Sequence, residues 1–306
     1  MNASNPQTLR VKEIASFLEA NATKQFYDFS EEKPPTTDVN VVADYYGVVI
    51  ALDYGFWRFR DGKFEADFYM VNGKPVKGAT FLWMKSKTLF TSNPSFFSLK
   101  NLRDLRGDGF IEWLCDDSGK VPFKDPKTRF NLAKDFAEQM WDHPIHKSFM
   151  EGQQKIATLA QLLERCMAYA DAPFCKKAHL LAKIMERQGY WTVADPENKL
   201  PPIDYHLINM AVKLNLIEVA TDITPKLAAC QALSPDDEWR LRSACADAYR
   251  ALGHQSGVDP YKLDDILWSE SRRNCQIAPY NCKQCLFDPV CHKNVVGFPV
   301  VETYRY

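Results

Sequence analysis

Four of the nine cysteines crowd into one short stretch near the end of the 306-residue sequence. Their spacing is Cys275-x6-Cys282-x2-Cys285-x5-Cys291. Short intervening loops can bring four thiolates to one centre at little cost in loop-closure entropy. Four soft thiolates suit a zinc ion or an iron–sulfur cluster. Chance clustering of buried cysteines is the alternative, and the local density disfavours it.

The spacing of these cysteines favours one metal over the other. Zinc ribbons use two C-x2-4-C pairs, and this stretch has only one C-x2-C. The gaps of six, two and five residues resemble the cluster loop of the endonuclease-III-type helix-hairpin-helix DNA glycosylases. That resemblance implies a [4Fe-4S] cluster, with zinc as the second choice. The loop Gln276–Asn281 has no cation, so it would gain no counterion-release energy from a DNA phosphate.

Asp204 follows Pro201-Pro202-Ile203 and precedes a helix-like run. An Asp at a helix start is by itself a cap, worth about 1 kcal/mol. In the superfamily that the cysteine loop resembles, however, a catalytic Asp begins a helix in a similar segment. The resemblance implies that Asp204 stabilises an oxocarbenium ion at the sugar C1′ and orients the attacking water.

The whole chain is also similar in order to the queuosine 5′-phosphate hydrolases, the queuosine-salvage N-glycosylases. The similar segments are VVIALDYGFW, PFCKKAHLLAKIM, IDYHLINMAVKLNLIEV, DEWRLRSACADAYRAL, KLDDILW and the final ETYRY. This resemblance implies hydrolysis of a nucleoside or 5′-nucleotide with release of queuine, a 7-deazaguanine base. Because a deazapurine has no N7 to protonate, the carboxylate and hydrogen bonds to the base must contribute more.

The same resemblance suggests residues that would hold the substrate. Aromatic faces would stack on the base, and cations would bind a 5′-phosphate. Ordinary core packing and ion pairing are the alternatives for these side chains. The aromatic candidates are Tyr54, Phe56, Trp57 and Tyr205, the cationic ones are Lys176, Lys177, His206 and Arg242, and Asp53 stands where the family has Asn.

The net charge helps to choose between the competing functions. Lys and Arg number 38 against 39 Asp and Glu, which gives a net charge of −1. A dedicated duplex-DNA binder usually has a basic excess. We therefore favour a small nucleoside or nucleotide partner over nucleic acid. The alternatives are an iron–sulfur DNA base-excision glycosylase and a non-enzymatic iron–sulfur module in which Asp204 only caps a helix.

The elements that must position these residues are mostly helical. Apolar periodicity predicts a helix over 8–27, and helix-start signals occur at Ser98, Asp125-Pro126 and Ser234. Residues 41–57 read as a buried helix or a strand. Asn72-Gly73 predicts a hairpin within 64–77. We expect a mainly α fold of the helix-hairpin-helix DNA-glycosylase type, with a small β-hairpin insertion and a C-terminal iron–sulfur loop.

Three regions are expected along the chain. Residues 1–150 form an N-terminal helical region with the hairpin, residues 151–268 the glycosylase-like catalytic region, and residues 269–306 the cluster loop and tail. No apolar run approaches the 18 residues that span a bilayer, and the N-terminus lacks the apolar run of a signal peptide. We therefore expect a cytoplasmic protein with no membrane partner.

Overall fold

The computed structural model describes residues 6–22, 38–60, 63–275, 280–293 and 297–305. The protein is mainly helical, as predicted, and its strands form two two-stranded antiparallel sheets. Within the described ranges, no helix is both long and apolar enough to cross a membrane.

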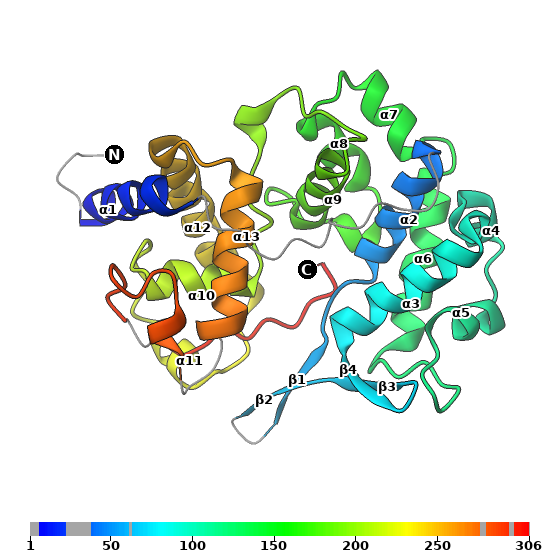
Figure 1. Ribbon diagram of the computed structural model, residues 1–306, viewed down its shortest axis with the longest axis horizontal. Coiled ribbons are helices and arrows are strands. Elements are labelled where there is room, and N and C mark those ends of the chain that lie inside the picture. The colour runs from blue at the N-terminus through cyan, green and yellow to red at the C-terminus, as the bar shows by residue number, and fades with distance from the viewer. Residues whose placement is uncertain (1–5, 23–37, 61–62, 276–279, 294–296, 306) are drawn as a thin grey trace. The chain divides into compact units, whose positions relative to one another are not determined.

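The chain divides into two compact units, and each unit is discontinuous in sequence. The first unit combines Met1–Asp28 with Lys199–Glu302, and the second combines Phe29–Asn198 with Thr303–Tyr306. The predicted regions of 1–150, 151–268 and 269–306 have different boundaries. Helix α1 (Pro6–Asn21) accounts for part of that difference, because its apolar stripe packs along α12 (Pro235–Ser256) of the first unit (Figure 1).

The first unit is a set of helices in which the stripe of α1 packs on α12. Val11, Ile14 and Leu18 of that stripe are buried, as the periodicity predicts. The predicted start of α12 is also confirmed, because Ser234 and Asp237 form a capping box and Gly257 ends the helix with a φ of 65°. The remaining helices are α10 (Tyr205–Lys213), α11 (Thr224–Ala228) and α13 (Pro260–Glu270), followed by a π-helical turn (Ser271–Cys275) and a 3-10 turn (Cys282–Gln284).

The second unit is built around α2 (Val39–Ala51), whose residues from Val42 to Ala51 are all buried. This helix settles the ambiguity of residues 41–57, and Asp38 caps it by accepting from the Asn40 N–H. Helices α6 (Pro126–Met140), α7 (Ile145–Glu151) and α9 (Lys176–Arg187) pack on α2. The others are α3 (Gly78–Ser92), α4 (Leu99–Arg103), α5 (Gly107–Leu114) and α8 (Ile156–Leu163), with 3-10 turns at Pro94–Phe97, Met167–Tyr169 and Pro196–Asn198.

The predicted helix starts in this unit are correct. Ser98 caps α4 by accepting from the Asn101 N–H, and α6 begins at Pro126. The predicted helix 8–27 of the other unit begins at Pro6 and continues to Asn21, and residues 23–27 lie outside the described ranges.

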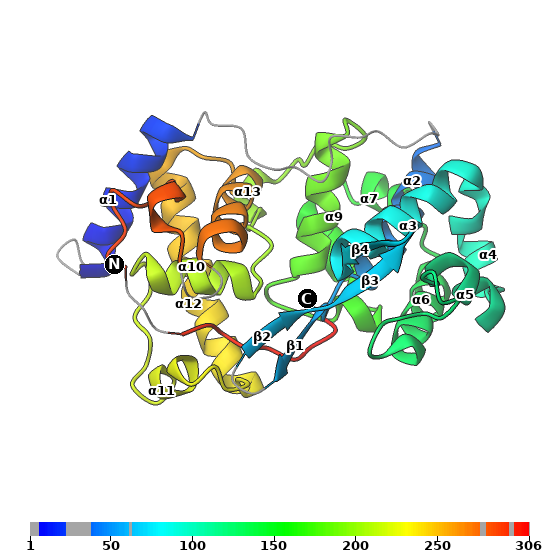
Figure 2. The same ribbon diagram turned by 60° about the horizontal axis from the view of Figure 1, so that its bottom comes forward.

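The hairpin at Asn72-Gly73 is confirmed, and a second hairpin precedes it (Figure 2). Strands β3 (Phe68–Val71) and β4 (Lys74–Lys77) pair antiparallel around a turn in which Asn72 and Gly73 have φ of 52° and 71°. Two successive positive φ angles are what this tight turn needs. Residues 64–66 instead belong to β2 (Lys63–Ala66), which pairs with β1 (Trp57–Arg60).

Candidate functional site

Asp204 is the N-cap of α10 and is buried, with 7 % of its surface exposed. One carboxylate oxygen, Oδ1, accepts from the backbone N–H groups of His206 at 2.8 Å and Leu207 at 3.1 Å. The positive end of the helix dipole favours the ionised carboxylate here. The segment Pro201–Ile203 that leads into the helix is buried as well. The local sequence therefore fixes one carboxylate at a defined place and in a defined orientation.

Aromatic side chains gather beside Asp204. The Tyr205 ring lies 4.5 Å from the His206 ring and 5.7 Å from that of Phe298, between centroids. His206 also meets the Trp268 ring of α13 edge-on at 5.7 Å. His206 Nδ1 shares a hydrogen bond with Ser271 Oγ at 3.2 Å. Tyr205 and Trp268 are partly exposed, so they offer ring surface next to the carboxylate.

A second carboxylate near this position was not singled out from the sequence. Tyr249 of α12 donates its hydroxyl to the Leu207 carbonyl at 2.6 Å. Its pKa is raised well above the usual value, first by burial and then by the charges of Cys245, Asp204 and Asp264. Asp204 and Asp264 therefore both lie near the Tyr249 hydroxyl. Asp264 is buried in α13, and its place in the KLDDILW segment is the signal that could have marked it.

Arg242 of α12, a predicted phosphate ligand, belongs to the same unit as Asp204. Its side chain is fully buried and forms an i,i+4 ion pair with Glu238 at 3.2 Å. A buried ion pair holds both partners in place, because removal of either leaves an uncompensated charge. Part of the guanidinium is therefore already engaged within the helix.

The other predicted substrate residues belong to the second unit: Asp53, Tyr54, Phe56, Trp57, Lys176 and Lys177. The structure brings several of them together around Arg129 of α6, which the sequence did not single out. Its guanidinium carbon lies 4.0 Å from the Tyr54 ring centroid and 5.1 Å from that of Phe56. Arg129 donates to Asp125 and to the Tyr54 carbonyl, and the Tyr54 hydroxyl donates to Asp125 at 2.6 Å. Trp57 is buried, with Lys124 Nζ 5.9 Å from its ring centroid.

Asp53 lies among the cations of this cluster. Burial raises the pKa of Asp53, and the charges of Lys176 and Lys177 act in the opposite direction. Its carboxylate also accepts a hydrogen bond from Trp83. Lys177 Nζ donates to the carbonyls of Ala51 at 2.8 Å and Tyr304 at 2.7 Å, and burial lowers its pKa well below the usual value.

Carboxylates accompany the cations of this cluster. They offset part of the positive charge with which the cluster would attract a phosphate. Phosphate binding by Lys176 and Lys177 accordingly stays a prediction from the sequence. The cations meant are Arg129, Lys176 and Lys177, and the carboxylates that act on them include Asp53, Asp125 and Asp171.

The four predicted metal ligands lie in the first unit as free thiols. Burial raises the pKa of Cys275 to about 11; the charge of Lys213 lowers it, those of Cys291 and Cys282 raise it, and the charge of Cys275 adds to the raised pKa of Cys285. The Cys275 thiol therefore lies within electrostatic range of the other three thiols. Within the described ranges, no three His, Cys, Asp or Glu side chains form a group that could hold a metal ion. Metal ligation therefore stays a prediction, and residues 276–279 of the intervening loop lie outside the described ranges.

Helix α10 connects the carboxylate to the cysteine segment. Asn209, in the middle of the helix, donates through Nδ2 to Ser271 Oγ at 3.1 Å and to the Cys275 carbonyl at 3.0 Å. Arg10 of α1 donates to the carbonyl of Leu214 at 2.7 Å and to that of Val290. The Phe17 and Phe287 rings are in contact at 5.9 Å. Helix α10 therefore both begins at Asp204 and binds the Cys275 carbonyl, and α1 contacts the cysteine segment at Phe287 and Val290.

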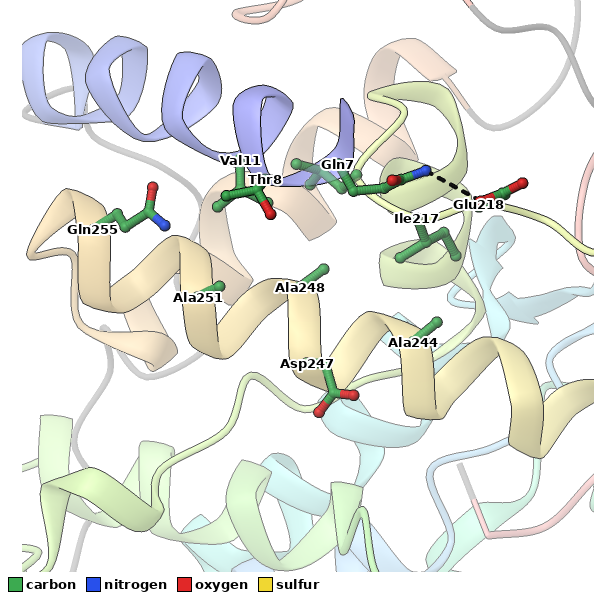
Figure 3. Close-up of a pocket in the computed structure, with 11 residues that line it drawn as sticks. Gln7, Thr8, Val11, Ile217, Glu218, Ala244, Asp247, Ala248, Ala251 and Gln255 are labelled. Carbon is green, nitrogen blue, oxygen red and sulfur yellow. Dashed lines mark hydrogen bonds between the residues drawn. The ribbon is translucent and has the colours of Figure 1, made fainter. Parts of the chain in front are cut away.

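A separate cavity of about 250 Å³ lies between α1 and α12 (Figure 3). Its lining is mainly apolar, with Ala244, Ala248 and Ala251 of α12 facing α1. Gln7 and Glu218 close one end through a hydrogen bond of 3.4 Å. None of the predicted site residues lines this cavity. It follows from small side chains along one helix face, which leave space that larger ones would fill.

No protein-family model matches the chain, and no curated protein matches it.

Proposed function

We propose that the protein hydrolyses the N-glycosidic bond of a nucleoside or 5′-nucleotide that carries a queuine-type 7-deazaguanine base. The observation that carries this proposal is the buried Asp204 carboxylate, whose Oδ1 is held by two backbone N–H groups at the start of α10. A carboxylate that is already desolvated and oriented does not have to reorganise as positive charge develops at the sugar.

Water attack at C1′ completes the reaction. The C1′–N bond breaks with its electron pair leaving on the base, and positive charge builds at C1′ beside Asp204. A water oxygen then bonds to C1′ and Asp204 accepts the water proton. The departing base nitrogen takes up a proton from solvent, and Asp204 returns its proton to solvent. The partly exposed rings of Tyr205 and Trp268, which both contact His206, would supply stacking surface for the base.

The proposal extends to the fold and the cofactor. We infer a variant of the helix-hairpin-helix DNA-glycosylase-like fold, supported by a helix that begins at the candidate carboxylate and a cysteine segment that follows α13. Cys275, Cys282, Cys285 and Cys291 would hold a [4Fe-4S] cluster, with zinc as the second choice, because four free thiols within 17 positions of the sequence have the right donor chemistry. Bound there, the metal would stiffen the segment that Asn209 ties to α10. The nine cysteines, all within the described ranges, form no disulfides, which agrees with a reducing, cytoplasmic location.

Base release from queuosine and from its 5′-monophosphate tests the proposal. Asp204→Asn keeps a side chain that can still cap α10, so we expect a nearly unchanged melting temperature and a loss of at least about 100-fold in rate. Asp259→Asn is the matched control. Asp259 caps α13 in the same way, by accepting from the N–H groups of Tyr261 and Lys262, and this variant should keep its activity.

Two results would contradict the proposal. One is no base release from either substrate by the folded, metal-replete protein. The other is equal activity of Asp204→Asn and the wild type. Damaged duplex DNA serves as the parallel substrate, and release of a base from DNA with a steep salt dependence of binding would favour the DNA-glycosylase alternative instead.

A further inference from the structure

Lys213 is a buried lysine at the C-terminal end of α10, with 3 % of its surface exposed. Its Nζ has no hydrogen-bond partner among the described residues. The ammonium instead lies 3.5 Å from the centroid of the Tyr280 ring, which follows the first cysteine of the segment by five positions. This geometry is a close cation–π contact, and it directs the ammonium toward the cysteine segment.

The thiols are the other neighbours of Lys213. Its charge acts directly on the Cys275 thiol. Its backbone carbonyl accepts a hydrogen bond from Cys291 Sγ at 3.6 Å. Two of the four predicted ligands therefore interact with Lys213, Cys275 through its charge and Cys291 through its backbone carbonyl. Lys213 itself is held by the last turn of α10.

Among the described residues, the Tyr280 ring face is the contact recorded for the Lys213 ammonium, and no acceptor atom is bonded to it. A ring face attracts a cation less strongly than an anionic centre does. The nearby carboxylate of Glu270 is engaged by Asn274 Nδ2 at 2.7 Å and by the Cys285 thiol. Metal binding releases the thiol protons and leaves a centre of net negative charge, for zinc and for a [4Fe-4S] cluster alike.

We propose that Lys213 is the buried countercharge of a metal–thiolate centre formed by the four cysteines, held in place by the Tyr280 ring. This inference rests on the cofactor part of the proposed function and deepens it. Lys213 would not ligate the metal. As a positioning residue, it would stabilise the thiolates electrostatically, and for an iron–sulfur cluster it would also favour the reduced state.

The test compares Lys213→Met, Lys213→Arg and the wild type, all purified anaerobically as the full chain. Lys293→Met is the matched control. The Lys293 ammonium also interacts electrostatically with Cys282 and Cys291. It is exposed, however, and forms an ion pair with Asp288 at 2.9 Å. The readouts are metal content, the reduction potential of the cluster and the rate of metal loss to a chelator.

We expect Lys213→Met to shift the reduction potential to more negative values and to weaken metal retention about 10-fold or more, the usual range for outer-shell partners. Lys213→Arg should restore both properties, and Lys293→Met should change neither by a comparable amount, because solvent screens its charge. If the purified metal is zinc, chelator competition alone decides. Tyr280→Leu is the second variant, and it should show a smaller effect in the same direction without removing the charge.

The inference is wrong if Lys213→Met retains metal and potential like the wild type, if it matches Lys293→Met, or if the wild type binds no metal. The substrate assay is run on the same preparations. An inactive protein with the expected potential or retention shift would sink the hydrolase proposal alone, whereas an active protein without the shift would sink only the role of Lys213.

Discussion

Asp44 lies inside α2 as a buried carboxyl group, and burial raises its pKa from 3.8 to about 8. A hydrogen bond from the Leu99 backbone acts in the opposite direction, and the charge of Asp38 adds to the increase. Between pH 3.8 and about 8, the Asp44 carboxyl is therefore protonated in the folded protein and ionised in the unfolded chain. The free energy of unfolding should therefore fall as the pH rises from about 4 to about 8.

Asp44→Asn removes this titration while keeping an acceptor for the Leu99 N–H. The variant should resemble the wild type near pH 5 and become more stable than it near pH 8, with the gap widening by up to about 1.4 kcal/mol for each pH unit. Urea unfolding at a series of pH values measures this. Parallel stability curves for the two proteins would show that Asp44 is not the titrating group.

Which site residues can be foreseen from the sequence depends on how local their signals are. Asp204 can be predicted as a cap, because a helix cap and its helix are adjacent in the chain. Arg129 cannot be foreseen in this way. The Tyr54 and Phe56 rings that it contacts are more than 70 positions away in the sequence, so only the packing of the fold brings them together. Lys213 reads as an ordinary helix-end lysine until the fold places Tyr280 against it.

Helix α2 shows what decides the form of an ambiguous segment. Its apolar, β-branched residues suit a strand as well as a helix. The helix succeeds because it buries residues on every side, and Gly47 lets the Phe136 ring of α6 approach its backbone. The Tyr169 hydroxyl donates to the Gly47 carbonyl at 2.7 Å in the same tight region. Turn and cap chemistry, by contrast, was local enough to predict the β3–β4 hairpin and the start of α12.

Gly47→Ala should destabilise the protein by roughly 1–3 kcal/mol, because overpacking a core forces neighbours to shift. A Cβ at this position would come within 2.4 Å of the Phe136 ring. Gly107→Ala is the control at the start of α5, where a Cβ meets nothing within 4 Å and alanine favours the helix. Thermal unfolding of both variants checks the prediction, which fails if they shift the melting temperature alike.

The two units are a property of the whole molecule that local patterns do not reveal. Sequence order suggests regions that follow one another. Instead, the N-terminal residues belong to the same unit as residues 199–302, and residues 303–306 belong to the same unit as residues 29–198. Residues 303–306 return to the second unit, where the Tyr304 carbonyl accepts from Lys177 Nζ and its ring meets that of Tyr54 edge-on. The last residues therefore complete the polar surroundings of a buried lysine.

Truncation after Glu302 should lower the free energy of unfolding by about 1–3 kcal/mol, because Lys177 loses one of its two carbonyl acceptors inside the protein. Tyr304→Leu keeps the carbonyl and removes only the ring contact, so its effect should be smaller. Denaturant unfolding followed by tryptophan fluorescence compares them. Equal losses in both variants would mean that the ring, rather than the carbonyl, matters.

The packing of α1 on α12 has a consequence for folding during synthesis. Its partner α12 ends at Ser256, roughly 235 residues after α1 is complete. At about 5–20 residues per second, α1 waits on the order of 10–50 s on the ribosome before that partner emerges. Residues 29–198 of the second unit are synthesised during this interval and can begin to fold. Helix α1 is thus packed on α12 long after it has been made, and its apolar stripe lacks that partner until then.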